Sequence, residues 1–227
     1  MEENHRVDLA TNDAYGRWRA GSRDALGRVM KGYRKPYTPP SVPDGQVDLS
    51  DPDSRVMRSK GLPHRRAYNV QTAVTEQQII LAAEISLAAA DFGQLEPMLD
   101  RALAHLSRHG IAEQPEAVVG DAGYWHTQQI QAIADRGIEV LVPPDGAARE
   151  GTRPGWENGL FEQMREKLRT DRGRKLYALR KTTIEPVFGQ IKYTRRVTQF
   201  MRRGRAAVHS ELRLVAATIA VGTGLRF

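Results

Sequence analysis

The apolar residues between positions 95 and 106 recur at the spacing of an α-helix, and this run limits the possible folds more than any other part of the sequence. Residues three and four apart lie on the same side of a helix, so the run forms one apolar stripe that must be buried. Gly110 follows it and is a common terminator of helices. We therefore expect a helix from about Gly93 to His109. The stripe consists of Leu95, Met98, Leu99, Ala102, Leu103 and Leu106.

Two β-prone runs precede this helix, at residues 67–74 and 79–87. They are separated by the short polar segment 75–78. Two such runs joined by a few polar residues are typical of a β-hairpin, which we expect here.

A second group of elements follows the helix. The apolar run 117–119 ends abruptly at Gly120, helical spacing returns at Ile130 and Ile133, and residues 138–142 are again apolar. This order is typical of a strand–helix–strand unit. Together with the hairpin and the first helix, it predicts the α/β class, with a mixed sheet flanked by helices.

The rest of the chain divides into a polar start and a mostly helical end. Residues 1–50 are polar and finish in a proline-rich run, which predicts a linker or a truncated remnant. Residues 143–158 are rich in glycine and proline and are expected to form a loop. We expect helices at 161–179 and 186–200. The apolar stretch 212–221 is expected to be a closing helix that packs on the core.

The composition excludes several classes of protein. The 227-residue chain has no cysteine, so disulfides, thiolate metal sites and cysteine nucleophiles are ruled out. Any metal ion would bind carboxylates or histidines, and hard ions such as Mg²⁺ suit carboxylates. No apolar stretch approaches the roughly 20 residues of a membrane helix. Residues 1–20 lack the pattern of a secretory signal, so we expect a cytoplasmic protein.

The formal net charge is +7 and the isoelectric point is near 9.9, which suits a polyanionic partner such as nucleic acid. Basic residues are concentrated between positions 192 and 205, with Tyr193 and Phe200 among them. Basic side chains beside aromatic rings are typical of nucleic-acid-binding surfaces. A solvated helix face is the plainer interpretation of the same charges. The basic residues of this stretch are Lys192, Arg195, Arg196, Arg202, Arg203 and Arg205.

Asp121 is the first candidate for a catalytic side chain. It follows the predicted strand 117–119 after a single glycine, and ligands of α/β folds collect beyond the carboxyl ends of strands. The glycines at positions 120 and 123 leave room for a metal ion and a phosphate backbone. An ordinary turn aspartate is the alternative interpretation.

Glu185 is the second candidate. A continuous helix would place it on one face with Lys181 and Lys192, which lie four residues before it and seven after it. Two-metal phosphodiester chemistry needs converging carboxylates, and flanking cations suit phosphates. A surface stripe of ion pairs is the alternative. Pro186 disfavours helix at the preceding residue, so Glu185 is expected at a helix start or a kink.

Four motifs occur in series: Asp-Pro-Asp-Ser-Arg-Val-Met at 51–57, Ala-Tyr-Asn-Val-Gln at 67–71, Gly-Asp-Ala-Gly-Tyr at 120–124 and Ile-Glu-Pro-Val-Phe-Gly-Gln-Ile-Lys at 184–192. Their order resembles bacterial insertion-sequence transposases of the DDE class, over about residues 49–227. The resemblance implies a ribonuclease-H-like fold and a divalent metal, Mg²⁺ or Mn²⁺. It also implies hydrolysis of double-stranded DNA at transposon ends, attack of the freed 3′ hydroxyl on target DNA, and, by analogy, a homodimer.

The resemblance assigns Asp121 to the family's second acidic residue and Glu185 to the third, both as metal ligands. The family places its first acidic residue on an early strand, in an Asp-Gly-Thr-like context upstream of the first motif. The sequence has no such context. Asp51 and Asp53 belong by the pattern to a later loop, and we do not expect them to replace it.

The residues around Glu185 resemble a conserved set of the family that contacts DNA. Tyr177 matches its tyrosine, Arg180 or Lys181 its basic residue, and Lys192 its lysine. Lys181 is favoured over Arg180 because it lies four residues before Glu185. The predicted DNA-binding residues are Tyr177, Arg180, Lys181, Lys192, Arg195, Arg196, Arg202 and Arg203.

Two functions stay open at this point. In the first, residues 51–227 form a partial ribonuclease-H-like catalytic domain, with its first strand missing or atypical, that cuts and joins DNA. In the second, the chain is a catalytically inactive transposase remnant that only binds DNA. A nuclease on the same fold is a further alternative, because fold does not decide reaction.

Overall fold

The computed structural model describes residues 48–58, 63–146 and 155–222. The polar segment 1–50 therefore lies almost wholly outside the described residues, as does the middle of the 143–158 loop. By its contacts the chain separates into two units, which are considered in turn.

The first unit contains, in its described part, a small antiparallel sheet that the sequence did not predict. β1 (Arg55–Met57) pairs with β2 (Arg65–Ala67), with Val56 opposite Arg66. Each strand has only three residues, too few for a period-two pattern to stand out.

Asp51 and Asp53 fix a turn in this first unit. Asp51 accepts hydrogen bonds from the Tyr68 hydroxyl at 2.5 Å and from the backbone N–H of Gly204 at 3.0 Å. Asp53 accepts from the N–H of Arg205 at 2.8 Å. That N–H belongs to the first residue of α6 (Arg205–Gly222), which has no partner within the helix. The two carboxylates therefore hold the start of α6.

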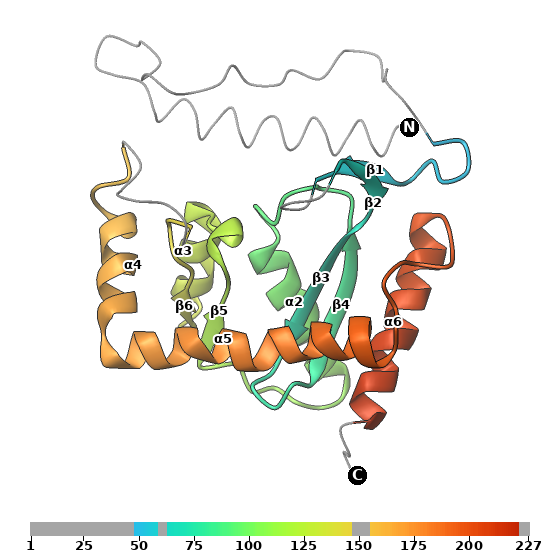
Figure 1. Ribbon diagram of the computed structural model, residues 1–227. Coiled ribbons are helices and arrows are strands. Elements are labelled where there is room, and N and C mark those ends of the chain that lie inside the picture. Colours follow the sequence, from blue (N-terminus) through green and yellow to red (C-terminus); the bar gives the residue numbers. More distant parts are fainter. Residues whose placement is uncertain (1–47, 59–62, 147–154, 223–227) are drawn as a thin grey trace. The chain divides into compact units, whose positions relative to one another are not determined.

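The second unit contains most of the predicted elements, at nearly the expected positions (Figure 1). The hairpin is formed by β3 (Asn69–Val74) and β4 (Ile80–Ser86), and α2 (Leu95–Arg108) follows it. β5 (Ala117–Val119) and β6 (Glu139–Leu141) pair in parallel, with Val118 opposite Val140. α3 (Thr127–Asp135) connects them, so the strand–helix–strand unit is confirmed.

The α/β class is thus confirmed, but the strands of the described part form three separate two-stranded sheets. The expected single mixed sheet is not formed there. β3 and β4 pair only with each other, and so do β5 and β6. A ribonuclease-H-like arrangement stays a prediction.

Two apolar clusters hold the second unit together. Met98 and Ala102 of α2 pack on Ala82 of β4, which confirms the direction of the predicted helical stripe. A second cluster joins Val187 and Ile191 to Ile219 of α6, and both Val187 and Ile219 have no exposed surface. It also includes apolar residues at both ends of the hairpin turn, so the end of the hairpin packs against the C-terminal part of the long helix described next.

The expected helices at 161–179 and 186–200 are wrong in their boundaries. α4 (Leu160–Arg169) ends at Thr170, whose hydroxyl accepts from the N–H of Gly173 at 2.9 Å and so caps the next helix. α5 (Asp171–Gly189) then runs past Pro186 and is followed by the π-helical turn η2 (Gln190–Thr194). The side-chain cap divides the first expected helix in two, and residues 195–204, between η2 and α6, form a loop.

Gly173 permits the sharp turn between α4 and α5. A Cβ at this position would lie 2.0 Å from the carbonyl oxygen of Lys167, which is backbone and cannot move aside cheaply. We expect Gly173→Ala to lower the free energy of unfolding by about 2–3 kcal/mol, the cost typical of an overpacked site.

Gly189 provides the matched control. It has helical dihedral angles and no atom within 4 Å of an added Cβ. Gly189→Ala should therefore raise the free energy of unfolding by about 0.5–1 kcal/mol. Urea unfolding followed by circular dichroism measures both variants. Equal effects of the two substitutions would contradict the role given to Gly173.

Within the described residues, no helix is long and apolar enough to cross a membrane.

Candidate active site

Asp121 stands at the position that the sequence predicted, beyond the carboxyl end of β5. It is the N-cap of the short turn η1 (Ala122–Tyr124), and its Oδ1 accepts from the N–H of Gly123 at 2.7 Å. Gly123 is exposed, so this turn meets solvent. Asp121 itself is half-buried, so its carboxylate is oriented by the backbone and keeps part of its surface open to solvent.

Asp91 lies beside Asp121, although the sequence analysis did not select it. A Cβ placed on Gly123 would be 2.9 Å from Oδ1 of Asp121 and 3.2 Å from Oδ2 of Asp91. Both carboxylates thus lie within 3.2 Å of one point. Asp91 lies five residues beyond the end of β4, whereas Asp121 lies two residues beyond the end of β5. The rule that ligands collect beyond strand ends points to this segment only once the end of β4 is known, because the apolar run continues to Ala90.

A buried glutamine joins the two carboxylate-bearing segments. Gln71 of β3 is 1% exposed, and its Nε2 donates to Oδ1 of Asp91 at 2.6 Å. Its Oε1 accepts from the hydroxyl of Tyr124, three residues after Asp121. Burial raises the pKa of Tyr124 well above its usual range, and the negative charges of Asp91 and Asp121 raise it further. Tyr124 therefore keeps its proton and remains a donor to Gln71.

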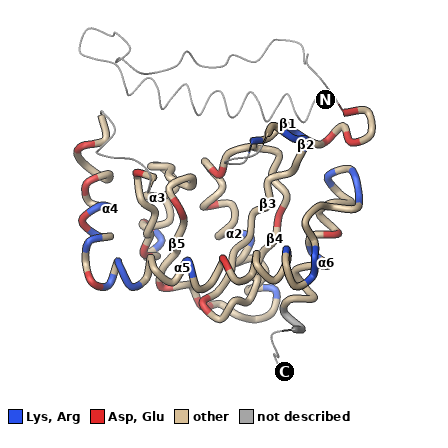
Figure 2. The backbone as a smooth tube through the Cα atoms, viewed as in Figure 1, with Lys and Arg blue, Asp and Glu red and all other residues tan. Residues whose placement is uncertain are grey.

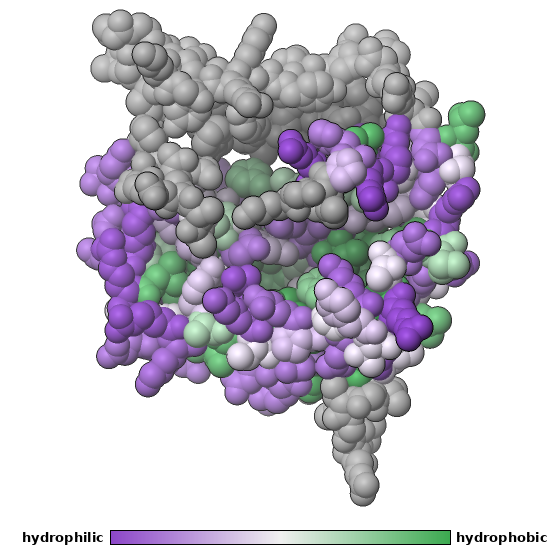
Figure 3. All heavy atoms as spheres, viewed as in Figure 1, coloured by the Kyte–Doolittle hydropathy of each residue, from purple (hydrophilic) through white to green (hydrophobic). Residues whose placement is uncertain are grey.

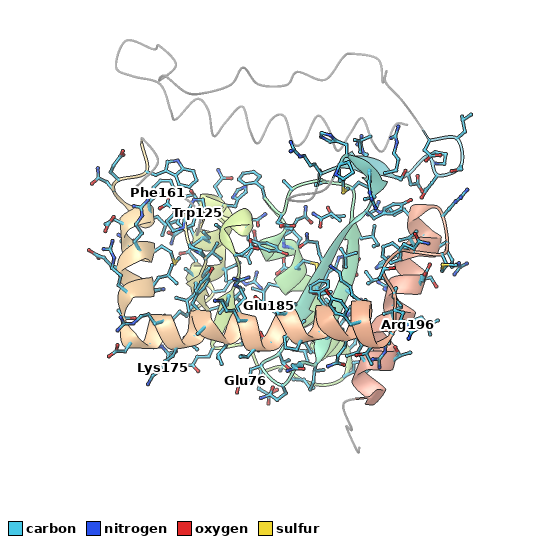
Figure 4. The ribbon with its side chains drawn as sticks, viewed as in Figure 1. Glu76, Trp125, Phe161, Lys175, Glu185 and Arg196 are labelled. Atoms are coloured by element: carbon cyan, nitrogen blue, oxygen red, sulfur yellow. The ribbon has the colours of Figure 1, made fainter. Side chains whose placement is uncertain are left out.

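Glu185 is exposed and lies within α5, four residues before its end at Gly189 and not at the helix start that the proline suggested (Figure 4). Helix continues here because a second residue compensates for Pro186. Proline has no N–H to donate to the carbonyl of Thr182, four residues earlier. That carbonyl instead accepts from the side-chain Nε2 of Gln78 at 3.1 Å. Gln78 reaches it from the hairpin turn with a left-handed φ of 65°.

This contact predicts an energetic coupling between Gln78 and Pro186. Gln78→Ala should lower the free energy of unfolding of the natural chain by about 0.5–1.5 kcal/mol, because the Thr182 carbonyl loses its donor. In a Pro186→Ala background the restored N–H bonds that carbonyl, so Gln78→Ala should cost far less. A double-mutant cycle by urea unfolding cancels the backbone strain at position 78, which both backgrounds share. Additive effects would show that the hydrogen bond has no energetic role.

The two neighbouring aspartates offer the donor type that Mg²⁺ or Mn²⁺ requires. In the described part of the chain, no three acidic or histidine side chains come together as a metal-binding group. Mg²⁺ is commonly held by only one or two carboxylates and completes its shell with water and substrate phosphates. Asp91 and Asp121 supply two carboxylates of this kind.

The predicted DNA-contacting residues of α5 differ in their surroundings. Tyr177 is half-buried, and the guanidinium of Arg180 lies 5.4 Å from its ring centroid. The Nε of Arg180 is buried and has no hydrogen-bond partner among the described residues. Lys181 is exposed one helical turn before Glu185. The geometry therefore keeps Lys181 on the face of Glu185 and directs Arg180 toward Tyr177.

The other predicted cations lie beyond α5. Lys192, on η2, is exposed, with Nζ 5.9 Å from the ring centroid of Phe188. Arg195 is engaged by the fold, because its Nε donates to the Thr218 hydroxyl at 2.9 Å and a terminal nitrogen donates to the Thr218 carbonyl. Arg196 is exposed in a left-handed conformation at the far end of α5 (Figure 4). The π-helical turn alters the regular spacing that would align Lys192 with Glu185.

The loop before α6 presents exposed basic side chains on a fixed backbone. Arg202 and Arg203 are exposed, and Met201, which precedes them, is 80% exposed. The carboxylate of Glu211 accepts from the N–H groups of Met201 and Arg202 at 2.9 Å each. Figure 2 shows basic residues in this loop and along α4 and α5. On the face drawn in Figure 3, hydrophilic side chains cover α4 and the first part of α5.

The comparison with family models decides the identity. A model described as the transposase DDE domain matches residues 48–221. The chain belongs to this transposase family. No curated protein and no solved structure matches it. The match spans β1 to α6 and includes Asp91, Asp121 and Glu185, so the DDE domain contains both predicted acidic residues and the neighbour that the structure adds.

Proposed function

We propose that this chain is the catalytic part of a DNA transposase of a bacterial insertion sequence. Its reaction would be metal-dependent hydrolysis of a phosphodiester at the transposon end, followed by transfer of the new 3′ end to target DNA. The membership in the DDE family supports the reaction class. The observation that carries the proposal is the oriented, partly exposed carboxylate of Asp121 beyond β5, with a second carboxylate beside it.

The proposed metal ligands are Asp121 and Glu185, with Mg²⁺ or Mn²⁺ as the ion. A bound divalent ion would polarise the scissile phosphate and lower the pKa of the attacking water. Asp121 would hold its carboxylate in place through the Gly123 N–H. Glu185 would contribute from α5, whose course past Pro186 depends on Gln78. We further propose that the hairpin, the parallel β5–β6 pair and the helices that pack on them have a ribonuclease-H-like arrangement.

The basic residues would bind the DNA backbone. Lys181 and Lys192 are proposed to contact phosphates near Glu185, and Arg196, Arg202 and Arg203 to contact DNA further away. Each phosphate neutralised releases counterions, so the logarithm of the affinity should fall with the logarithm of salt by about 0.9 per contact. Arg195 is proposed to position the loop that carries these residues, through its hydrogen bond to Thr218, and not to contact DNA directly.

A second candidate function is DNA binding without cleavage. It is favoured by the sequence, which has no match for the Asp-Gly-Thr-like context of the family's first acidic residue. On that account the exposed cations bind DNA and the carboxylates have no catalytic task.

Nicking of supercoiled plasmid separates the two functions. The purified chain is incubated with Mg²⁺, with Mn²⁺, or with a chelator, and DNA binding is measured in parallel by mobility shift. Transposase activity predicts relaxed circles only when a metal is present, while binding persists in the chelator. Salt-sensitive binding with intact plasmid under all three conditions would favour the non-cleaving protein.

A further inference from the structure

Gln71 is buried at a position where a polar side chain without hydrogen bonds would lower the stability of the fold. It lies on β3, is 1% exposed, and is the only buried polar or charged residue in the described part of the second unit. A buried amide without hydrogen bonds costs on the order of 1–3 kcal/mol. Gln71 avoids this cost by contacting two polar residues that flank the Asp121 site, Asp91 and Tyr124.

The two hydrogen bonds fix which end of the amide faces which residue. The carboxylate of Asp91 can only accept, so it selects the NH₂ group, and the amide oxygen then accepts from the hydroxyl of Tyr124. A flipped amide would place its oxygen against a carboxylate oxygen. Asp91 and Tyr124 together hold the Gln71 amide in one orientation, and the Gln71 NH₂ group in turn holds Asp91 in place.

This bridge spans two sheets that are not paired strand to strand. β3 belongs to the hairpin, whereas Asp121 and Tyr124 follow β5 of the other two-stranded sheet. The bridge therefore links the segment after β4, which carries Asp91, to the segment after β5, which carries Asp121. The result is the approach of both carboxylates to Gly123.

We propose that Asp91 is a further metal-site carboxylate beside Asp121, and that Gln71, held by Tyr124, is the positioning residue that fixes it there. The inference rests on the proposed function, because it assigns a ligand and its support to the same site. Asp91 accepts from Gln71 through Oδ1 and turns Oδ2 toward Gly123, so one carboxylate both anchors and faces the site. Mg²⁺ is commonly held by one or two carboxylates, with water in the remaining positions and substrate phosphates when substrate is bound, so metal binding is measurable without DNA.

The test measures Mn²⁺ binding to the full chain by electron paramagnetic resonance of the free ion, without DNA and without turnover. Asp91→Asn should weaken Mn²⁺ binding about tenfold or more, as Asp121→Asn should. Gln71→Met keeps the side-chain length but removes both hydrogen bonds, and should weaken binding about 3–10-fold, in the range of outer-shell substitutions. Tyr124→Phe keeps the ring, removes only the hydroxyl, and should shift binding in the same direction by less.

Nicking kinetics supply the second readout. Gln71→Met should lower kcat while leaving KM for DNA within about twofold, and raised Mn²⁺ should restore part of the lost rate. A purely structural role would not respond to the metal concentration. Asp100→Asn is the control, because Asp100 is an aspartate of α2 whose carboxylate pairs with Arg136 at 2.7 Å, away from Gly123. It should leave Mn²⁺ binding unchanged.

The outcomes separate the inference from the proposed function. If Asp121→Asn abolishes Mn²⁺ binding and Asp91→Asn leaves it within twofold, the inference is overturned and the proposed function stands. If Asp91→Asn weakens binding but neither Gln71→Met nor Tyr124→Phe does, the positioning role is overturned. If the natural chain binds no Mn²⁺, or Asp121→Asn binds it normally, the proposed metal site itself fails. Unfolding midpoints confirm that each variant is folded.

Discussion

Asp121→Asn is expected to reduce metal-dependent nicking by at least about 10³-fold. The substitution keeps the size of the side chain and its ability to accept from the Gly123 N–H, so the turn after β5 should persist. It removes the negative charge that a divalent ion requires. Losses of 10²–10³ or more are typical when a group that stabilises developing charge is removed. Initial rates of plasmid relaxation measure the effect.

Asp145→Asn is the matched control for Asp121. Asp145 follows β6 as Asp121 follows β5, but its Oδ2 pairs with Arg165 at 2.8 Å. Loss of the Asp145 charge should lower the free energy of unfolding, because the largely buried Arg165 then has fewer partners. The nicking rate of the folded protein should stay within about twofold of the natural rate. A nicking rate that falls equally in both variants would mean that Asp121 acts through stability alone.

Glu185→Gln is expected to reduce nicking by about 10²-fold or more, while DNA binding in chelator stays within about threefold. The amide preserves the length and helix propensity of the side chain, so α5 should be unchanged. Only the charge proposed to hold metal is lost. Single-turnover nicking and mobility shift, run on the same preparation, measure both quantities.

Glu166→Gln provides the comparison for Glu185, because Glu166 is an exposed glutamate on the neighbouring helix α4. It should nick at the natural rate. Normal nicking by Glu185→Gln would contradict the proposed role of Glu185 as a metal ligand. The metal would then have to be bound by Asp91 and Asp121 without a ligand from α5.

The elements that the sequence predicted well are those with local periodicity. The stripe of α2, the hairpin around residues 75–78 and the strand before Asp121 are each determined by apolar spacing and by the polar or glycine residues that end them. The start of α6 was missed because its first turn is stabilised from outside, through Asp53 and the N–H of Arg205. The sequence of the helix itself contains no pattern that indicates this contact.

The errors along α4 and α5 have the same physical origin. The break between the two helices depends on the Thr170 side chain and on the space at Gly173, and spacing of apolar residues is insensitive to both. The helix continues through Pro186 because Gln78, more than 100 residues away in sequence, donates to the freed carbonyl. A local rule for proline predicts a break here, and a long-range hydrogen bond removes its cause.

The candidate site was predicted in part. Asp121 was found because it follows a strand of clear apolar character. Asp91 was missed because the run before it continues into the loop, so the strand end was not evident. Gln71 could not be found by pattern, since its importance lies in being buried between Asp91 and Tyr124.

The chemistry of the nicked strand tests the central claim most directly. Plasmid relaxed by the chain in Mg²⁺ or Mn²⁺ is probed for its ends, by polymerase extension from the nick before and after phosphatase treatment. Hydrolysis that prepares a 3′ hydroxyl for strand transfer predicts immediate extension without phosphatase, and no nick when Asp121 is replaced by Asn. Ends that extend only after phosphatase, or nicking that continues in chelator, would contradict the assignment of a metal-dependent transposase site.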